Sequence, residues 1–198
     1  MNTNVNFILM ADSYKYSHAP QIPAGTEYIT SYGEARGSDD PDYTESLQFG
    51  MQMFAKKYLT TPITMADVDE ARSYIPEHGE PFNEDWLIVV NEMGGKLPLS
   101  IEAVPEGMVI PLRNVLFQVT NTDPRFAWLT SFIETMLLRD GGWYPITVAT
   151  NSWKIKQLMK ATYDTTGSVQ GLDFKLHDFG CRGVSSNESA AMGGLAHL

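Results

Sequence analysis

The chain has 198 residues, 43% hydrophobic and 19% charged, which is ordinary for a globular protein of one or two domains. Its formal net charge of −10 excludes a nucleic-acid-coating role, because no basic stripe is available to neutralise a phosphate backbone. The single cysteine, Cys181, cannot form an internal disulfide, and no signal peptide or long apolar span is visible. We therefore expect a cytoplasmic protein that does not contact a membrane.

The first half of the chain predicts a mixed α+β unit. Aromatic and β-branched residues favour a strand over 27–32, and apolar residues at helical spacing predict an amphipathic helix over 46–59. Thr64 and Asp67 have the spacing of a helix cap, and Pro76 is expected to end that helix. Further short elements follow, namely a helix over 86–90 and strands over 99–104, 108–110 and 115–120, with a turn at 105–107 between the first two.

The second half of the chain is expected to alternate strand and helix. Asp123 and Pro124 have the N-cap and first-turn pattern of a helix over 124–139 with a broad apolar face. A strand over 146–149 and a helix over 151–163 come next. The change of pattern near Pro145 suggests a domain boundary. An α+β domain would cover 1–145, and 146–198 would be the start of a second domain. A single strand–helix unit cannot bury its own sheet, so we expect the chain to stop inside this second domain.

The run from 175 to 186 carries the most suggestive local pattern. Apolar residues predict a short strand, and Gly180 and Gly183 predict a tight turn after it. Ser185 and Glu188 have the spacing of a capping box, so a helix is expected to begin at residue 186 or 187. A strand, a glycine turn and a helix N-terminus in this order are a common place to hold an anion.

Arg182 and Phe179 give this corner its chemistry. The guanidinium can fork onto a phosphate, and the phenyl ring offers a flat apolar surface beside it. Together they suggest a ligand with a ring and phosphate groups. The alternative is an ordinary corner with the phenylalanine in the core and the arginine in solvent. A kinase interpretation of the Asp-Phe-Gly triplet fails, because no glycine-rich loop, lysine strand or catalytic loop precedes it.

Five blocks of sequence resemble the nicotinamide phosphoribosyltransferase family in the same order, namely 12–15, 31–36, 103–107, 143–152 and 175–186. The resemblance implies a type II phosphoribosyltransferase, in which a mixed α+β domain is combined with an α/β-barrel-like domain. In this chain, 146–198 would be the truncated start of that barrel-like domain. It also implies a head-to-tail homodimer with active sites at the subunit interface. The implied reaction joins nicotinamide to phosphoribosyl pyrophosphate, giving nicotinamide mononucleotide and pyrophosphate for NAD salvage, with Mg²⁺ and the assistance of ATP.

The resemblance also implies roles for individual residues. Phe179 matches the aromatic residue that stacks on one face of nicotinamide, and Tyr14 matches the tyrosine that the other subunit places on the opposite face. Arg182 matches an arginine that contacts nicotinamide and donor phosphates, Arg36 one that reaches the pyrophosphate, and Asp12 an acidic residue near the nicotinamide end. The alternatives are a tyrosine packed on its own domain, a solvated arginine at a strand end, and an aspartate that caps a helix.

Metal-binding and nucleophilic residues are not expected in this chain. His177 and His197 are predicted to be structural, since no second ligand stands at metal spacing. Cys181 has no paired base and is interpreted as a neighbour of the site. We expect Mg²⁺ and ATP to be bound only by a complete enzyme.

The sequence departs from the family in two loops and in length. The loop over 37–40 is short and acidic where longer family members carry lysines, and 139–142 is slightly expanded. The chain covers less than half of a family member. Two hypotheses follow: an enzyme part that needs a complementary C-terminal chain, or a catalytically inactive remnant that only interacts or dimerises. A third, unrelated hypothesis is a small phosphate-binding α/β module.

Overall fold

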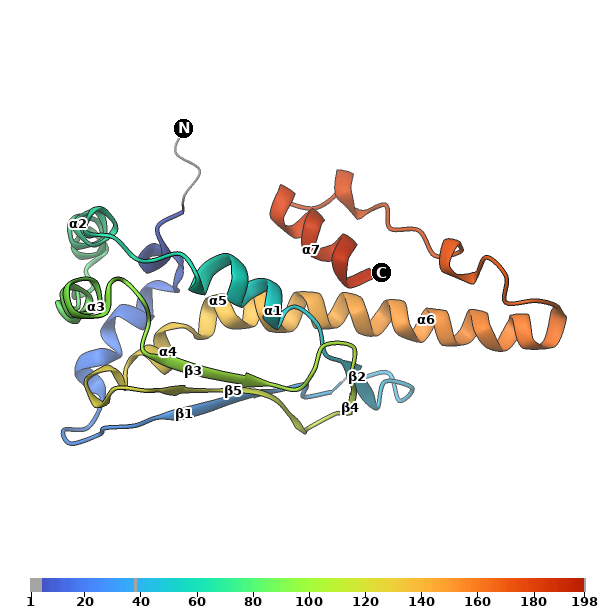
Figure 1. Ribbon diagram of the computed structural model, residues 1–198, viewed down its shortest axis with the longest axis horizontal. Helices are drawn as coiled ribbons and strands as arrows, with labels where there is room; N and C mark the ends of the chain where they lie inside the picture. The colour runs from blue at the N-terminus through green and yellow to red at the C-terminus, as the bar shows by residue number, and fades with distance from the viewer. Residues whose placement is uncertain (1–4, 38, 198) are drawn as a thin grey trace.

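The computed structural model describes residues 5–37 and 39–197. Figure 1 shows small sheets beneath a layer of helices, with one long helix running beside them and the chain folding back over that helix at its C-terminal end. The expected mixed α+β architecture is confirmed. The strands are β1 (Thr30–Glu34), β2 (Glu45–Leu47), β3 (Leu99–Ala103), β4 (Val109–Pro111) and β5 (Val115–Asn121). The α-helices are α1 (Met51–Phe54), α2 (Met65–Tyr74), α3 (Asp85–Met93), α4 (Leu129–Phe132), α5 (Glu134–Leu138), α6 (Tyr144–Thr166) and α7 (Asn187–His197).

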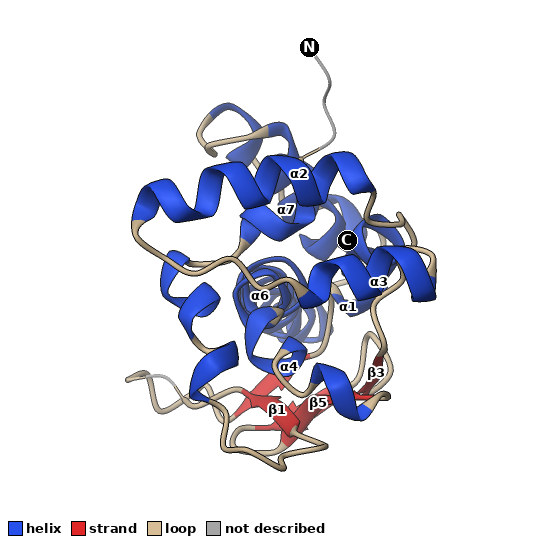
Figure 2. Cartoon of the chain, turned by 90° about the vertical axis from the view of Figure 1, so that its left-hand side faces the viewer, coloured by secondary structure: helices blue, strands red, loops and turns tan. Residues whose placement is uncertain are grey.

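Two antiparallel sheets organise the first part of the chain. One has the order β1-β5-β3, and the other pairs β2 with β4. The turn at 105–107 therefore connects strands of different sheets and does not close a hairpin. In the central strand β5, Leu116, Phe117 and Val119 are buried, so this strand supplies the sheet's contribution to the core. Figure 2 shows the strands gathered on one side of the helices.

An aromatic cluster forms the centre of the helical layer. The ring of Trp86 in α3 meets Trp128 and Phe132 edge-on, with centroid distances of 4.9 and 5.0 Å. Such edge-to-face pairs stabilise a core beyond the burial of their area. The same core also contains buried aliphatic side chains and methionine, including Val68, Val89, Leu129, Ile133 and Met136. The first part of the chain thus has a contiguous core of its own.

The predicted caps were more accurate than the predicted lengths. Thr64 and Asp67 form the expected capping box at the start of α2. The helix predicted over 46–59 begins only at Met51, because Gly50 with φ of 110° turns the chain after β2. This helix continues as a π-helical turn over Ala55–Leu59. The helix predicted over 124–139 is divided into a 3-10 turn, Pro124–Phe126, and the short helices α4 and α5.

The strand predicted over 146–149 is wrong, because these residues lie in α6. A π-helical turn over Arg139–Trp143 joins α5 to α6, so the chain is helical across Pro145. Ile146, Ala149 and Thr150 are buried at helical spacing, which explains why the apolar run is helical here. The domain boundary near this position stays a prediction. Within the described residues, no helix combines the length and the apolar character needed to cross a bilayer.

Candidate functional site

The corner over 175–186 has a different backbone from the one predicted. Short 3-10 turns occupy Leu172–Phe174 and Gly180–Arg182, and the predicted strand between them is absent from the described structure. A carboxylate oxygen of Asp178 accepts a hydrogen bond of 2.7 Å from the backbone N–H of Gly180. Such a local side-chain bond favours a turn over an extended strand. The strand prediction over 175–179 was therefore wrong, while the turn after it was correct.

Helix α7 begins where the sequence predicts, but with a different cap. The hydroxyl of Ser186 accepts from the backbone N–H of Ser189 at 3.1 Å, and the Ser189 hydroxyl accepts from the Ser186 N–H at 3.1 Å. The reciprocal box thus uses Ser186 and Ser189, in place of the predicted Ser185 and Glu188. Because the serine takes the capping role, the carboxylate of Glu188 is available for other contacts.

Phe179 and Arg182 both point outward at this corner. The phenyl ring is 70% exposed, and the carbon at the centre of the guanidinium of Arg182 lies 5.9 Å from the ring centroid. The ring of His177 lies on another side, with centroids 6.3 Å apart. The alternative of a phenylalanine buried in the core is therefore wrong. An exposed ring beside a cation can stack on a planar ligand.

The other predicted residues of the nicotinamide end lie in the N-terminal segment. Tyr14 belongs to a 3-10 turn, Ser13–Ser17, and its ring is 50% exposed with His18 against its edge at 5.2 Å. Asp12 precedes this turn without capping it, and its carboxylate accepts a 2.8 Å hydrogen bond from the hydroxyl of Thr135 in α5. The cap alternative for Asp12 is thus wrong, and the carboxylate is held on the surface of α5.

Arg36 is exposed just beyond β1. The neighbouring carbonyl of Ala35 accepts a 2.8 Å hydrogen bond from the backbone N–H of Arg113, which fixes the chain at this point. In the described part of the chain, no hydrogen bond, ion pair or ring contact connects Tyr14, Asp12 or Arg36 to the 175–186 corner. Figure 1 shows the reason, since the N-terminal segment and the corner lie at separate places on the molecule.

Two cavities were found away from the predicted side chains. One, of about 470 Å³, lies between the N-terminal segment and the aromatic cluster, with Tyr16, Phe82 and Trp128 among its walls. The other, of about 130 Å³, lies between the 55–59 turn and α7, with Tyr58, Asp140 and Glu188 among its walls. None of the predicted site residues lines either cavity.

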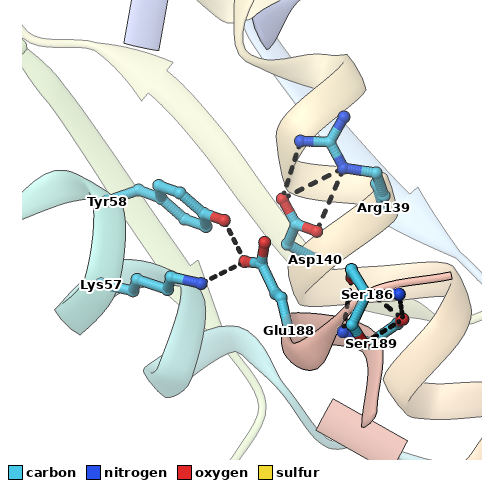
Figure 3. A network of polar contacts seen from close by, with 7 residues as sticks. All are labelled: Lys57, Tyr58, Arg139, Asp140, Ser186, Glu188 and Ser189. Carbon is cyan, nitrogen blue, oxygen red and sulfur yellow. Dashed lines mark hydrogen bonds and ion pairs between the residues drawn. The ribbon is translucent and has the colours of Figure 1, made fainter. Parts of the chain in front are cut away.

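The smaller cavity borders a polar network that the sequence did not predict (Figure 3). The carboxylate of Glu188 accepts hydrogen bonds from the ammonium of Lys57 and the hydroxyl of Tyr58. Beside them, buried Asp140 binds the guanidinium of Arg139 at 3.0 Å. The helical spacing over 46–59 predicted only that Tyr58 packs in the core. The S-x-x-E spacing predicted that Glu188 is part of a helix cap. No signal in the sequence joined the two segments.

The network changes the ionisation of its members. Burial raises the pKa of Tyr58 above its usual range, and the hydrogen bond to Glu188 and the negative charge of Asp140 raise it further. Burial also pushes the pKa of Glu188 upward, but hydrogen bonds from Lys57 and Tyr58 outweigh this and leave that pKa below its ordinary value. At neutral pH the network therefore contains an ionised glutamate and a neutral tyrosine.

Residues with metal-binding chemistry are dispersed in the described structure. Within residues 5–37 and 39–197, no three His, Cys, Asp or Glu side chains come together in a way that could hold a metal ion. His197 instead bridges two segments, with its Nε2 3.0 Å from the carbonyl oxygen of Leu176 and its Nδ1 3.2 Å from the hydroxyl of Ser152. The thiol of Cys181 is exposed beside the corner.

Comparisons with a family model and with curated proteins agree on which proteins this chain is similar to. A family model described as "Nicotinamide phosphoribosyltransferase, N-terminal domain" matches residues 6–101. A nicotinamide phosphoribosyltransferase from Xanthomonas campestris is 48% identical over 98% of this chain and 41% of its own length. The chain is similar to the nicotinamide phosphoribosyltransferase family over nearly its whole length. It matches the N-terminal portion of that family.

Two further relatives support the family and the fold. The nicotinamide phosphoribosyltransferase of Acinetobacter baylyi is 30% identical over 100% of this chain and 42% of its own length. The crystal structure of human nicotinic acid phosphoribosyltransferase covers 96% of this chain and 35% of its own, with a TM-score of 0.59 and 18% identity. This structural likeness shows a shared fold. The chain spans about two fifths of the length of the curated relatives described here.

Proposed function

We propose that this chain is the N-terminal part of an enzyme that joins nicotinamide to phosphoribosyl pyrophosphate, giving nicotinamide mononucleotide and pyrophosphate. The observation that carries the proposal is the 48% identity to the Xanthomonas nicotinamide phosphoribosyltransferase across 98% of the chain. A match over 98% of the chain extends across the corner with Phe179 and Arg182, and both side chains there are exposed. The family match disfavours the unrelated phosphate-binding module.

The residues of this chain have chemistry that suits the proposed reaction. The nicotinamide ring becomes positively charged as the bond to the ribose forms, so an aromatic face binds the product-like ring more strongly than the neutral one. Phe179 would supply one such face, and Tyr14 of a second subunit would supply the other. Arg182 would fork onto a donor phosphate, Arg36 would reach the pyrophosphate, and Asp12 would lie at the nicotinamide end.

Activity is proposed to need a C-terminal complement, and uncovered apolar side chains support this. Trp143, Leu158 and Phe174 are large residues that are between 70% and 79% exposed. Clusters of exposed large apolar residues usually mark a surface that another protein segment covers. The curated relatives are longer than this chain, which spans 41% and 42% of their length, and we propose that the rest of such an enzyme covers these side chains.

Mg²⁺ and ATP are proposed for the complete enzyme. Side chains of the described residues do not gather into a cation site, so this part of the chain does not fit the metal by itself. We assign no step of the reaction to the metal through this chain's residues. The role of the chain is confined to binding and orienting the ring and the donor phosphates.

The decisive experiment compares the chain alone with the chain fused to the remaining part of the Xanthomonas relative. Nicotinamide mononucleotide is measured after incubation with nicotinamide, phosphoribosyl pyrophosphate, Mg²⁺ and ATP. We expect product from the fused protein and none from the chain alone. Product from the chain alone would refute the need for a complement. A folded, inactive fused protein, with the intact relative active in the same assay, would favour the inactive remnant.

Substitutions in the fused protein test the residues themselves. Arg182→Ala should raise KM for phosphoribosyl pyrophosphate, because it removes a bidentate charged contact. Phe179→Ala should weaken nicotinamide binding by about 1 kcal/mol, the usual contribution of an aromatic pair. Lys175→Ala is the matched control, because it removes an exposed positive charge nearby. Equal kinetics for Arg182→Ala and Lys175→Ala would show that the arginine assignment is wrong.

A further inference from the structure

Glu188 connects α7 to the first half of the chain. Its carboxylate accepts from Lys57 and Tyr58, which lie in the π-helical turn that extends α1 (Figure 3). Among the described residues, the side-chain hydrogen bonds that join α7 to residues before Trp143 are those of Glu188. Helix α7 is also attached to α6, where the hydroxyl of Tyr144 donates to the Ser189 carbonyl at 3.2 Å and His197 contacts Ser152, and to the carbonyl of Leu176 through His197.

Two helical turns next to Glu188 have irregular geometry. The turns Ala55–Leu59 and Arg139–Trp143 are π-helical, a conformation that is rare and is frequently found at functional sites. Glycines make the second turn compact, since a Cβ on Gly141 would already lie 3.3 Å from the Cβ of Phe54. The chain therefore brings two unusual turns and an ionised carboxylate together at the first turn of α7.

The position of α7 determines the position of the 175–186 corner. At one end of the corner, the Nε2 of His197 in the last turn of α7 binds the carbonyl oxygen of Leu176 at 3.0 Å. At the other end, Ser186 caps the first turn of the helix. Between them, the carbonyl of Gly180 accepts from the backbone N–H groups of Gly183 and Val184 at 2.8 and 3.0 Å, so the loop is tight. A displacement of α7 would therefore move Phe179 and Arg182 with it.

We propose that Glu188 is a positioning residue of the phosphoribosyl transfer. By binding Lys57 and Tyr58 it holds α7, and with it the Phe179–Arg182 corner, in a fixed place against the first half of the chain. Glu188 acts through the helix and does not touch the substrates. The inference rests on the proposed function for its kinetic consequence, whereas the structural part, that these contacts hold the corner in place, stands independently of it.

Two adjacent lysines provide a matched pair for the test. Lys57 binds Glu188, whereas Lys56 beside it is an exposed side chain of the same turn that forms no ion pair with the described residues. In the fused protein, Lys57→Met and Glu188→Gln should each raise KM for phosphoribosyl pyrophosphate about three- to fivefold with little change in kcat, the range expected for a partly exposed charged pair. Lys56→Met should leave KM unchanged.

The double variant separates positioning from a general loss of stability. If Lys57 and Glu188 act through one contact, Lys57→Met combined with Glu188→Gln should raise KM no further than either single variant. A merely structural role would lower the melting temperature and the folded fraction, with KM per folded molecule unchanged. That result, or the same KM for the Lys56 and Lys57 variants, would overturn the proposal.

A measurement on the chain itself keeps this test separate from the proposed function. Hydrogen exchange of the backbone amides over 177–186 reports how firmly the corner is held. We expect these amides to exchange faster in Lys57→Met and Glu188→Gln than in Lys56→Met, whether or not the fused protein makes nicotinamide mononucleotide. Unchanged exchange in all the variants would refute the positioning role. Changed exchange with an inactive fused protein would refute the proposed function only.

Discussion

Gly94 and Gly95 offer a test of how the N-terminal part is held together. Both residues have left-handed backbone, with φ of 61° and 78°, directly after α3. A Cβ added to Gly94 would have nothing within 4 Å, whereas a Cβ on Gly95 would lie 2.2 Å from the carbonyl oxygen of Ile63 and 2.8 Å from its nitrogen. Gly94→Ala and Gly95→Ala thus share a conformational cost, and only the second adds a collision with backbone.

The structure gives different magnitudes for the two substitutions. Left-handed backbone costs an alanine about 1 kcal/mol, which is the whole effect expected for Gly94→Ala. In Gly95→Ala the collision also breaks the 2.9 Å hydrogen bond from the N–H of Ile63 to the carbonyl of Gly95. It weakens the 3.0 Å hydrogen bond from the N–H of Gly95 to the carbonyl of Val89. Losing one backbone hydrogen bond and shifting a packed segment adds about 3 kcal/mol. The total of about 4 kcal/mol is a large part of the stability of a typical domain.

Urea unfolding of the chain, followed by circular dichroism and by tryptophan fluorescence, measures both effects. The fluorescence reports on this region because Trp86 and Trp128 are buried in the same core. We expect the free energy of unfolding to fall about 3 kcal/mol further in Gly95→Ala than in Gly94→Ala. Equal losses in the two variants would show that the contact with Ile63 is not rigid and that the reasoning from its geometry is wrong.

Three further predictions concern other parts of the chain. Thr64→Ala should cost about 1 kcal/mol in chemical unfolding through loss of the capping box with Asp67, while Thr64→Ser should cost little because serine caps equally well. Gly194→Ala should raise the unfolding free energy by about 0.5–1 kcal/mol, since it lies in α7 with nothing within 4 Å of the new Cβ; a destabilised variant would show that the helix is closely covered there. Burial raises the pKa of Tyr16 from 10.0 to about 12, so its contribution to stability is complete below pH 10 and is lost as the pH rises toward 12. Tyr16→Phe should therefore lose less stability than the wild type over that interval, and parallel declines would contradict the assignment.

Local signals in the sequence predicted local structure well. The cap of α2 depends on two residues, Thr64 and Asp67, that are close in sequence, and it formed as predicted. The strands over 99–104 and 115–120 were also found at nearly the predicted positions. Their partners were not predictable in the same way, because the choice between a hairpin and two separate sheets depends on β1 and β2 from far along the chain.

The two wrong strand predictions have different physical causes. Ile146 and its β-branched neighbours have a preference for strands. In the structure, however, the chain is already helical from α5 onward, and Ile146 and Ala149 lie on the buried face of α6. Tertiary packing of this kind regularly overrides weak local propensity. At 175–179, apolar residues also suggested a strand, but Asp178 binds the next turn and no neighbouring strand pairs with the segment in the described chain.

Only part of the candidate site could be predicted from the sequence. The local pattern over 175–186 identified Phe179 and Arg182 as candidate site residues, and both side chains are exposed in the structure. The residues that hold this corner were not marked. Lys57 and Tyr58 were interpreted as part of an amphipathic helix and Glu188 as a cap, because the contact joins residues 131 and 130 positions apart in the sequence. A sequence pattern can report a side chain that meets a ligand, but it carries little information on which distant segment keeps that side chain in place.

The exposure of Phe179 itself argues for an incomplete site. A phenyl ring that is 70% exposed gains little from the arginine 5.9 Å away, because water screens that cation and solvates the ring edge. The same contact becomes several times stronger once a ring ligand and a second protein surface exclude the water. Tyr14 is 50% exposed, and in the described part of the chain no hydrogen bond, ion pair or ring contact joins it to Phe179. Two exposed aromatic faces without a contact between them in one chain are compatible with the proposal that each closes a pocket built with another polypeptide.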